Sequence, residues 1–101
     1  MDKQTPHYPL EMVKNLVRAN KVRITNTALS GAHLLDLEIH DVWDIVLSLA
    51  RDDFYKSMTT YSDHREWQDV YRPNTNVGRI YLKLTIRDGV LILSFKELYN
   101  D

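Results

Sequence analysis

The chain has 101 residues, no cysteine and a formal net charge of −1, with 44% hydrophobic and 27% charged residues. This composition predicts one folded domain, residues 1–101, with a modest core, and it excludes disulfides and thiolate metal sites. No apolar run approaches the ~20 residues that span a bilayer, and the N-terminus has no apolar signal core. We therefore expect a soluble cytoplasmic protein without a membrane partner.

The charges are unevenly distributed along the chain. Between Ser30 and Asp53 there are six acidic residues and one basic residue, whereas the remainder has twelve basic and eight acidic residues. A net charge near zero argues against strong non-specific binding to nucleic acid. The surplus of basic residues outside this segment still allows a local cationic site.

The first half is predicted to be mainly helical, and it begins with a helix, a short strand and a second helix. Apolar residues recur at helical spacing after Pro9, at Leu10, Val13, Leu16 and Val17. A short strand is expected at Val22 to Ile24, and Thr25 or Thr27 can cap the helix that follows.

The clearest helix is DVWDIVLSLARDD, residues 41–53, for which Asp41 is a plausible N-cap. One apolar stripe follows the i, i+3, i+4, i+7 pattern: Val42, Ile45, Val46 and Leu49. This stripe is expected to pack in the core.

The second half is predicted to consist of strands. Four segments are rich in β-branched and aromatic residues or alternate in polarity: FYKSMTTY (54–61), WQDVYR (67–72), GRIYLKLTI (78–86) and VLILSFKE (90–97). Helices followed by sequential strands predict an α+β fold. We expect about three N-terminal helices packed on one face of a twisted, mainly antiparallel sheet.

The last two strands are joined by Asp88-Gly89, a strong signal for a two-residue hairpin turn. That turn would pair Arg87 with Val90 and, further along, Tyr81 with Lys96. The residues then predicted to face the core are Leu82, Leu84, Ile86, Leu91, Leu93 and Phe95. The opposite, open face would carry Tyr81, Lys83, Ser94 and Lys96.

Alternation also divides the two middle strands between the faces. Lys56, Met58 and Thr60 share one face, and Gln68, Val70 and Arg72 share one. If these strands join the same sheet, Lys56 and Gln68 could converge with Tyr81 and Lys96. The sequence leaves the strand order open.

A cluster of two lysines, a tyrosine and a glutamine without carboxylates suits an anionic substrate. Ammonium groups neutralise phosphate, and Tyr and Gln donate directed hydrogen bonds. Such a set could cleave RNA without metal: one group deprotonates the 2′-hydroxyl and another protonates the leaving 5′-oxygen. Lys and Tyr on the solvent face of a sheet are also ordinary, so spacing alone does not decide between these interpretations.

The histidines give no metal signal, because none of the four, His7, His33, His40 and His64, shows an i, i+4 spacing to another. No metal and no cofactor are expected. His64 beside Asp63 could act as a general acid or base, or could be a solvated loop residue.

Specific motifs run almost end to end along the chain: TPH, VKNLV, DFYKSMTTYSDH, WQDVYRP and the closing YLKLTI…VLILSFKE pair. Together they resemble the MqsR family, the motility quorum-sensing regulator toxins of type II toxin–antitoxin systems. The resemblance implies a RelE/YoeB-like ribonuclease fold and an mRNA interferase that cuts single-stranded mRNA around GCU. It also implies an MqsA-like antitoxin, through which alone the toxin would reach operator DNA.

In that family, activity is attributed to four motif positions, which here are Lys56, Gln68, Tyr81 and Lys96. Lys56 and Lys96 would neutralise the scissile phosphate, Tyr81 would contact it or transfer a proton, and Gln68 would position the RNA.

Further contacts to RNA are expected from Tyr55, Met58, Arg72 and Lys83. The alternative is a non-catalytic module that binds RNA or protein through the same face. The edge strand Val22 to Ile24 could accept an antitoxin strand. The sequence does not specify the base preference, which residue is the general acid and which the base, or the oligomeric state. It also does not distinguish an antitoxin that occludes the site from one that inhibits allosterically.

Overall fold

A computed structural model describes residues 1–99 of the chain. The helices are α1 (Leu10–Arg18), α2 (Asn26–Leu34), α3 (Ile39–Ser48) and a 3₁₀ turn, η1 (Arg51–Asp53). The strands are β1 (Asp2–Lys3), β2 (Val22–Ile24), β3 (Phe54–Thr59), β4 (Trp67–Tyr71), β5 (Asn74–Thr75), β6 (Gly78–Ile86) and β7 (Val90–Glu97).

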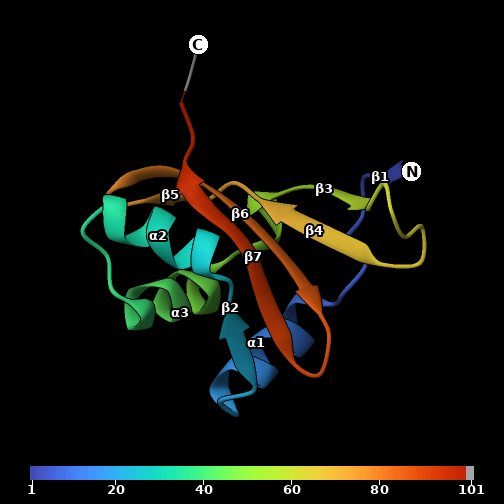
Figure 1. Cartoon of the computed structure of the whole chain (residues 1–101), viewed down its shortest axis with the longest axis horizontal. Helices are drawn as coiled ribbons and strands as arrows, with labels where there is room; N and C mark the ends of the chain where they lie inside the picture. Colours follow the sequence, from blue (N-terminus) through green and yellow to red (C-terminus); the bar gives the residue numbers. More distant parts are fainter. Residues whose placement is uncertain (100–101) are drawn as a thin grey trace.

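The main sheet has the strand order β1-β3-β4-β6-β7-β2, and β5 pairs with β6 beside this path. All neighbours are antiparallel except β2 and β7, which are parallel. Figure 1 shows the three helices gathered on one side of the long strands. The predicted α+β architecture is confirmed, and β2 supplies one edge of the sheet.

Helix starts follow local capping chemistry. The Oγ1 of Thr25 accepts a hydrogen bond from the backbone N–H of Ala28 at 3.1 Å, which confirms one of the two predicted caps. The prediction of Asp41 as the N-cap of α3 was wrong, because the helix begins after Glu38. Asp41 is the third helical residue, and its carboxylate accepts the backbone N–H of Glu38 at 2.7 Å. Asp is effective at either position, so the sequence pattern placed the N-cap three residues too late.

The core lies between the helices and one face of the sheet. It is formed by small and branched residues from the helices and by alternate strand residues: Val13, Val17, Ala28, Ala32, Val42, Val46, Leu49, Tyr71, Ile80, Leu82, Leu84, Val90, Ile92 and Phe95. Each of these side chains is buried. Within residues 1–99, no helix has the length and apolarity needed to cross a membrane.

The closing hairpin departs from the predicted two-residue turn. Its loop has three residues, Arg87 to Gly89, and both Asp88 and Gly89 have positive φ, at 52° and 101°. Ile86 consequently pairs with Val90, one position away from the predicted register. Gly89 also packs closely against Lys21, the residue that precedes β2, since a Cβ at position 89 would meet the Lys21 carbonyl oxygen at 2.7 Å.

A β-bulge at Leu93 restores the predicted register before the open-face residues are reached. Leu84 pairs with Ile92, whereas Lys83 pairs with Ser94 and Tyr81 with Lys96. The extra residue in β7 means that Val90 and Ile92 enter the core, in place of the predicted Leu91 and Leu93. The pairing of Tyr81 with Lys96 is confirmed because two one-residue shifts cancel.

Candidate active site

The open face is organised by strand pairing into rows that cross the sheet. Lys56 pairs with Val70, Val70 pairs with Lys83, and Lys83 pairs with Ser94, so these residues form one row over four strands. Tyr81 and Lys96 form the next row. Paired residues lie on the same face, so Lys56, Tyr81, Lys83 and Lys96 are on the side opposite the core.

Tyr81 stands at the centre of this group. The Lys96 Nζ lies 5.2 Å from the centroid of its ring, within cation–π range. Burial raises the pKa of the Tyr81 phenol above its usual value, and the nearby Lys56 ammonium offsets part of that rise. Tyr81 is therefore protonated at neutral pH, so its hydroxyl can donate a hydrogen bond or a proton.

Lys83 belongs to the first row, beside the Tyr81–Lys96 row, and its side chain is half-buried. Burial lowers the pKa of its ammonium, and the positive charge of Lys96 lowers it further. An anion bound here would relieve the repulsion between the two ammonium groups. Sequence reasoning placed Lys83 among the RNA contacts, and its central position suits a closer role in the chemistry.

Tyr55 and Arg72 border the same group. The strand is irregular between Phe54 and Lys56, and the ring of Tyr55 lies 4.3 Å from the Arg72 guanidinium and 5.6 Å from the Lys56 Nζ. The Arg72 guanidinium over the ring restricts the side-chain orientation of Tyr55. Tyr55 and Arg72, both predicted to contact RNA, therefore lie beside the cluster.

Gln68 and Met58 occupy a different row. They pair with each other, two residues along their strands from the Lys56–Val70 pair, which corresponds to about 7 Å. This row lies on the far side of the Lys56–Lys83 row from Tyr81. The structure thus brings together Lys56, Tyr81 and Lys96, whereas Gln68 shares their face but stands apart from Tyr81.

One carboxylate reaches the cluster from the N-terminal strand. Asp2 lies 3.7 Å from the Lys56 Nζ, because β1 pairs with β3 at the edge of the sheet. Sequence reasoning missed this contact, since a two-residue strand carries little pattern of its own. The pair is partly solvated and leaves the Lys56 ammonium open to exchange Asp2 for phosphate.

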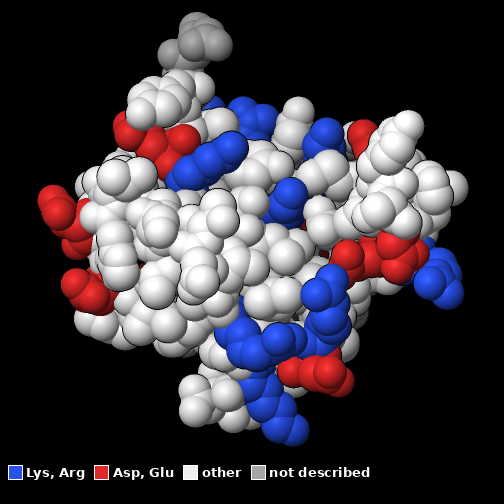
Figure 2. Space-filling model, in the orientation of Figure 1, with Lys and Arg blue, Asp and Glu red and all other residues white. Residues whose placement is uncertain are grey.

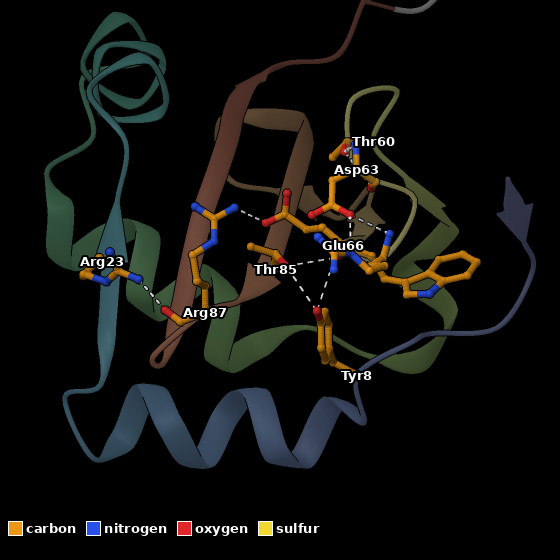
Figure 3. Close-up of polar contacts among 9 residues, drawn as sticks. Tyr8, Arg23, Thr60, Asp63, Glu66, Thr85 and Arg87 are labelled. Carbon is orange, nitrogen blue, oxygen red and sulfur yellow. Dashed lines mark hydrogen bonds and ion pairs between the residues drawn. The ribbon is translucent and has the colours of Figure 1, made fainter.

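The hairpin end of the molecule has its own polar contacts, separate from the cluster (Figure 3). Arg87 forms an ion pair with Glu66, and Arg23 donates to the Arg87 carbonyl oxygen. The Tyr8 hydroxyl lies 3.2 Å from the Thr85 Oγ1, which ties the N-terminal segment to β6. These groups satisfy one another and stabilise the hairpin.

The loop between β3 and β4 is also internally bonded. The Asp63 N–H donates to the Thr60 Oγ1 at 2.8 Å, and hydrogen bonds from Arg65 lower the pKa of the Asp63 carboxyl. His64 is exposed in this loop. Within residues 1–99, no group of three or more His, Asp and Glu side chains is arranged to hold a metal ion.

The surface charge is unevenly distributed over the face shown in Figure 2. Acidic groups line the side where α2 and α3 lie, and others lie at the opposite side of the molecule. Basic groups are scattered over the strands, and the densest group lies around α1, β2 and the end of the β6–β7 hairpin. An anion would therefore be attracted to local groups of Lys and Arg, not to a whole face.

Two comparisons with known proteins identify the family of this chain. A family model described as "Motility quorum-sensing regulator, toxin of MqsA" matches residues 5–97. The chain belongs to the MqsR toxin family. It is 53% identical over 97 residues to the mRNA interferase toxin MqsR of Escherichia coli strain K12, an alignment that covers 96% of this chain and 99% of the relative. The predicted family membership is confirmed.

Proposed function

We propose that this member of the MqsR family is the toxin of a type II toxin–antitoxin system, an endoribonuclease that cleaves mRNA in the cytoplasm. The activity is assigned to one domain, residues 1–101, acting without metal. The observation that supports it most is the grouping of Lys56, Tyr81, Lys83 and Lys96 on the sheet face opposite the core.

The chemistry suited to these groups is transesterification of an RNA phosphodiester. The 2′-oxygen attacks phosphorus and loses its proton, the bond to the 5′-oxygen breaks, and the products are a 2′,3′-cyclic phosphate and a 5′-hydroxyl end. Lys56 and Lys96 stabilise the additional negative charge that develops on the phosphate oxygens.

The proton transfers follow from the protonation states. Tyr81 keeps its proton at neutral pH because burial raises its pKa, so it is assigned as the donor to the leaving 5′-oxygen. Lys83 has a lowered pKa, which increases its population of neutral amine, so it is assigned as the base for the 2′-hydroxyl. Gln68 and Met58, one row away, are assigned to the neighbouring nucleotide, with cleavage preferred around GCU.

An MqsA-like antitoxin is the proposed partner, with operator DNA contacted only through it. The relevant structural feature is β2, an edge strand of three residues that pairs with β7 on one side only. Its outer backbone groups could extend the sheet by one strand. An added strand there would be separated from β6, which carries Tyr81, by β2 and β7. This position favours inhibition in which the antitoxin does not cover Tyr81 directly.

The test is incubation of purified protein with a defined single-stranded RNA in EDTA. Wild type should yield fragments with 5′-hydroxyl ends, Lys56→Ala should yield none above background, and the control Lys14→Ala, in α1, should match wild type. Intact RNA that nonetheless binds the protein would support the non-catalytic module instead. In cells, expression should arrest growth, and co-expression of the cognate antitoxin should relieve the arrest.

A further inference from the structure

A groove of about 340 Å³ opens beside the open-face cluster of Lys56, Tyr81, Lys83 and Lys96, and Lys96 belongs to both. It lies between the end of α2 and the end of β7 and is lined by Gly31, Leu34, Leu35, Lys96, Glu97 and Tyr99. We propose that this groove, named here the base groove, holds one base of the RNA next to the scissile phosphate. The proposal rests on the ribonuclease function proposed above and adds a subsite to it.

The base groove exists because α2 runs unusually close to β7. β2 pairs with β7 only as far as Ile24 and Ile92, after which Thr25 caps α2 and the helix continues along the same edge. A Cβ on Gly31 would meet the Phe95 carbonyl oxygen at 1.8 Å, so only glycine permits this approach. The next turn of α2 consequently stands beside the last residues of β7.

Two of the apolar side chains that line the groove are not used by the core. Leu34 is 87% exposed and Tyr99 is 77% exposed, so neither side chain contributes substantially to the core. An exposed aromatic ring opposite aliphatic side chains provides a stacking surface for an unpaired base. Exposed apolar side chains that line a concave site indicate ligand binding more strongly than isolated exposed apolar side chains do.

Lys96 connects the groove to the proposed chemistry. It lines the groove, and its Nζ also lies 5.2 Å from the Tyr81 ring. A nucleotide has an anionic phosphate and an aromatic base. Lys96 could bind the phosphate, and the apolar side chains of the adjoining groove could stack on the base. Because the groove adjoins the lysines of the open-face cluster, a nucleotide is favoured as its occupant over a protein segment.

Glu97 adds a basis for discrimination among bases. Its carboxylate lines the groove and can only accept hydrogen bonds when ionised. Cytosine, adenine and guanine carry an exocyclic amino group that can donate to it, whereas uracil can donate only from its ring N3–H. The groove is therefore expected to favour an amino-bearing base over uracil at one position beside the cleaved bond.

The experiment compares Tyr99→Ala with Tyr61→Ala, the same loss at another exposed tyrosine, which lies in the loop after β3. Cleavage and binding are measured on RNAs that vary one base at a time around the cut site. Tyr99→Ala should raise KM on the order of 5- to 100-fold, Tyr99→Phe should restore it, and Tyr61→Ala should leave it unchanged. Glu97→Gln should reduce the preference against uracil at one position only.

Equal KM values and equal base preferences for Tyr99→Ala and Tyr61→Ala, in a wild type that cleaves RNA, would overturn the base groove alone. A wild type that binds RNA without cleaving it, with binding weakened by Tyr99→Ala, would support the groove while the nuclease proposal fails. Loss of antitoxin affinity with unchanged RNA kinetics in Tyr99→Ala would also overturn it, because the groove would then be a protein contact.

Discussion

The two faces of strand β6 differ in what their residues do. Ile80, Leu82 and Leu84 are fully buried against the helices, whereas Tyr81 and Lys83, between them, face away and remain half-exposed. Neighbouring residues of one strand thus serve stability on one side and the proposed chemistry on the other. Substitutions of adjacent residues should therefore separate folding from cleavage.

The largest effect is expected for Tyr81→Phe on the open face. Removing the hydroxyl removes the proposed proton donor, so kcat should fall about 10²- to 10⁴-fold. The ring and its contact with Lys96 remain, so the thermal midpoint should stay close to wild type. Single-turnover cleavage and a thermal melt on the same preparation check both parts, and wild-type turnover would remove Tyr81 from the mechanism.

The matching substitution on the core face is Leu82→Ala. Leu82 is fully buried and pairs with Phe95, so a cavity should cost about 2–5 kcal/mol of unfolding free energy. Lys83→Ala, one residue on, should cost less than about 1 kcal/mol, because its side chain is on the open face. Urea denaturation measures both; similar losses would mean that the two faces are not separable.

A smaller effect is expected where β1 reaches the open face. Asp2→Asn removes the carboxylate 3.7 Å from the Lys56 Nζ, so phosphate should bind Lys56 without competition. KM for RNA should decrease up to several-fold at low salt and converge with wild type at high salt. Glu11→Gln, in α1, is the control, and an unchanged KM for Asp2→Asn would show that the ion pair does not compete with substrate.

The smallest effect concerns the N-terminal segment on the core face, where His7 stacks on Trp67 at 5.2 Å between ring centroids. Burial and the Lys3 ammonium lower the His7 pKa below 6.5, so the unfolded chain binds more protons as the pH falls through that value. This contribution therefore makes the folded state less stable below about pH 6.5. His7→Gln should show a smaller decrease in the urea midpoint between pH 7.5 and 5 than wild type.

Much of the fold could be predicted from local patterns. The period of two in GRIYLKLTI assigned Leu82 and Leu84 to the core and Tyr81 and Lys83 to the open face, and the strand begins and ends where the pattern does. Turn and cap details were less accurate, because Asp88-Gly89 is compatible with more than one loop length and Asp41 with more than one helix position. Such local alternatives differ by small energies, and packing selects among them.

The site was only partly predictable, for a different reason. Alternation determined that Lys56, Gln68, Tyr81 and Lys96 could share a face, but pairing between distant strands decided which of them meet. That pairing placed Lys56 near Tyr81, left Gln68 on the far side of the Lys56 row from Tyr81, and put Lys83 in the Lys56 row beside Tyr81 and Lys96. The base groove depends on how closely α2 approaches β7, which a single glycine reveals only once the two elements are in place. Side-chain direction along a strand is set by its own backbone, whereas distances across a sheet are set by contacts between residues far apart in the chain, and only the tertiary structure supplies them.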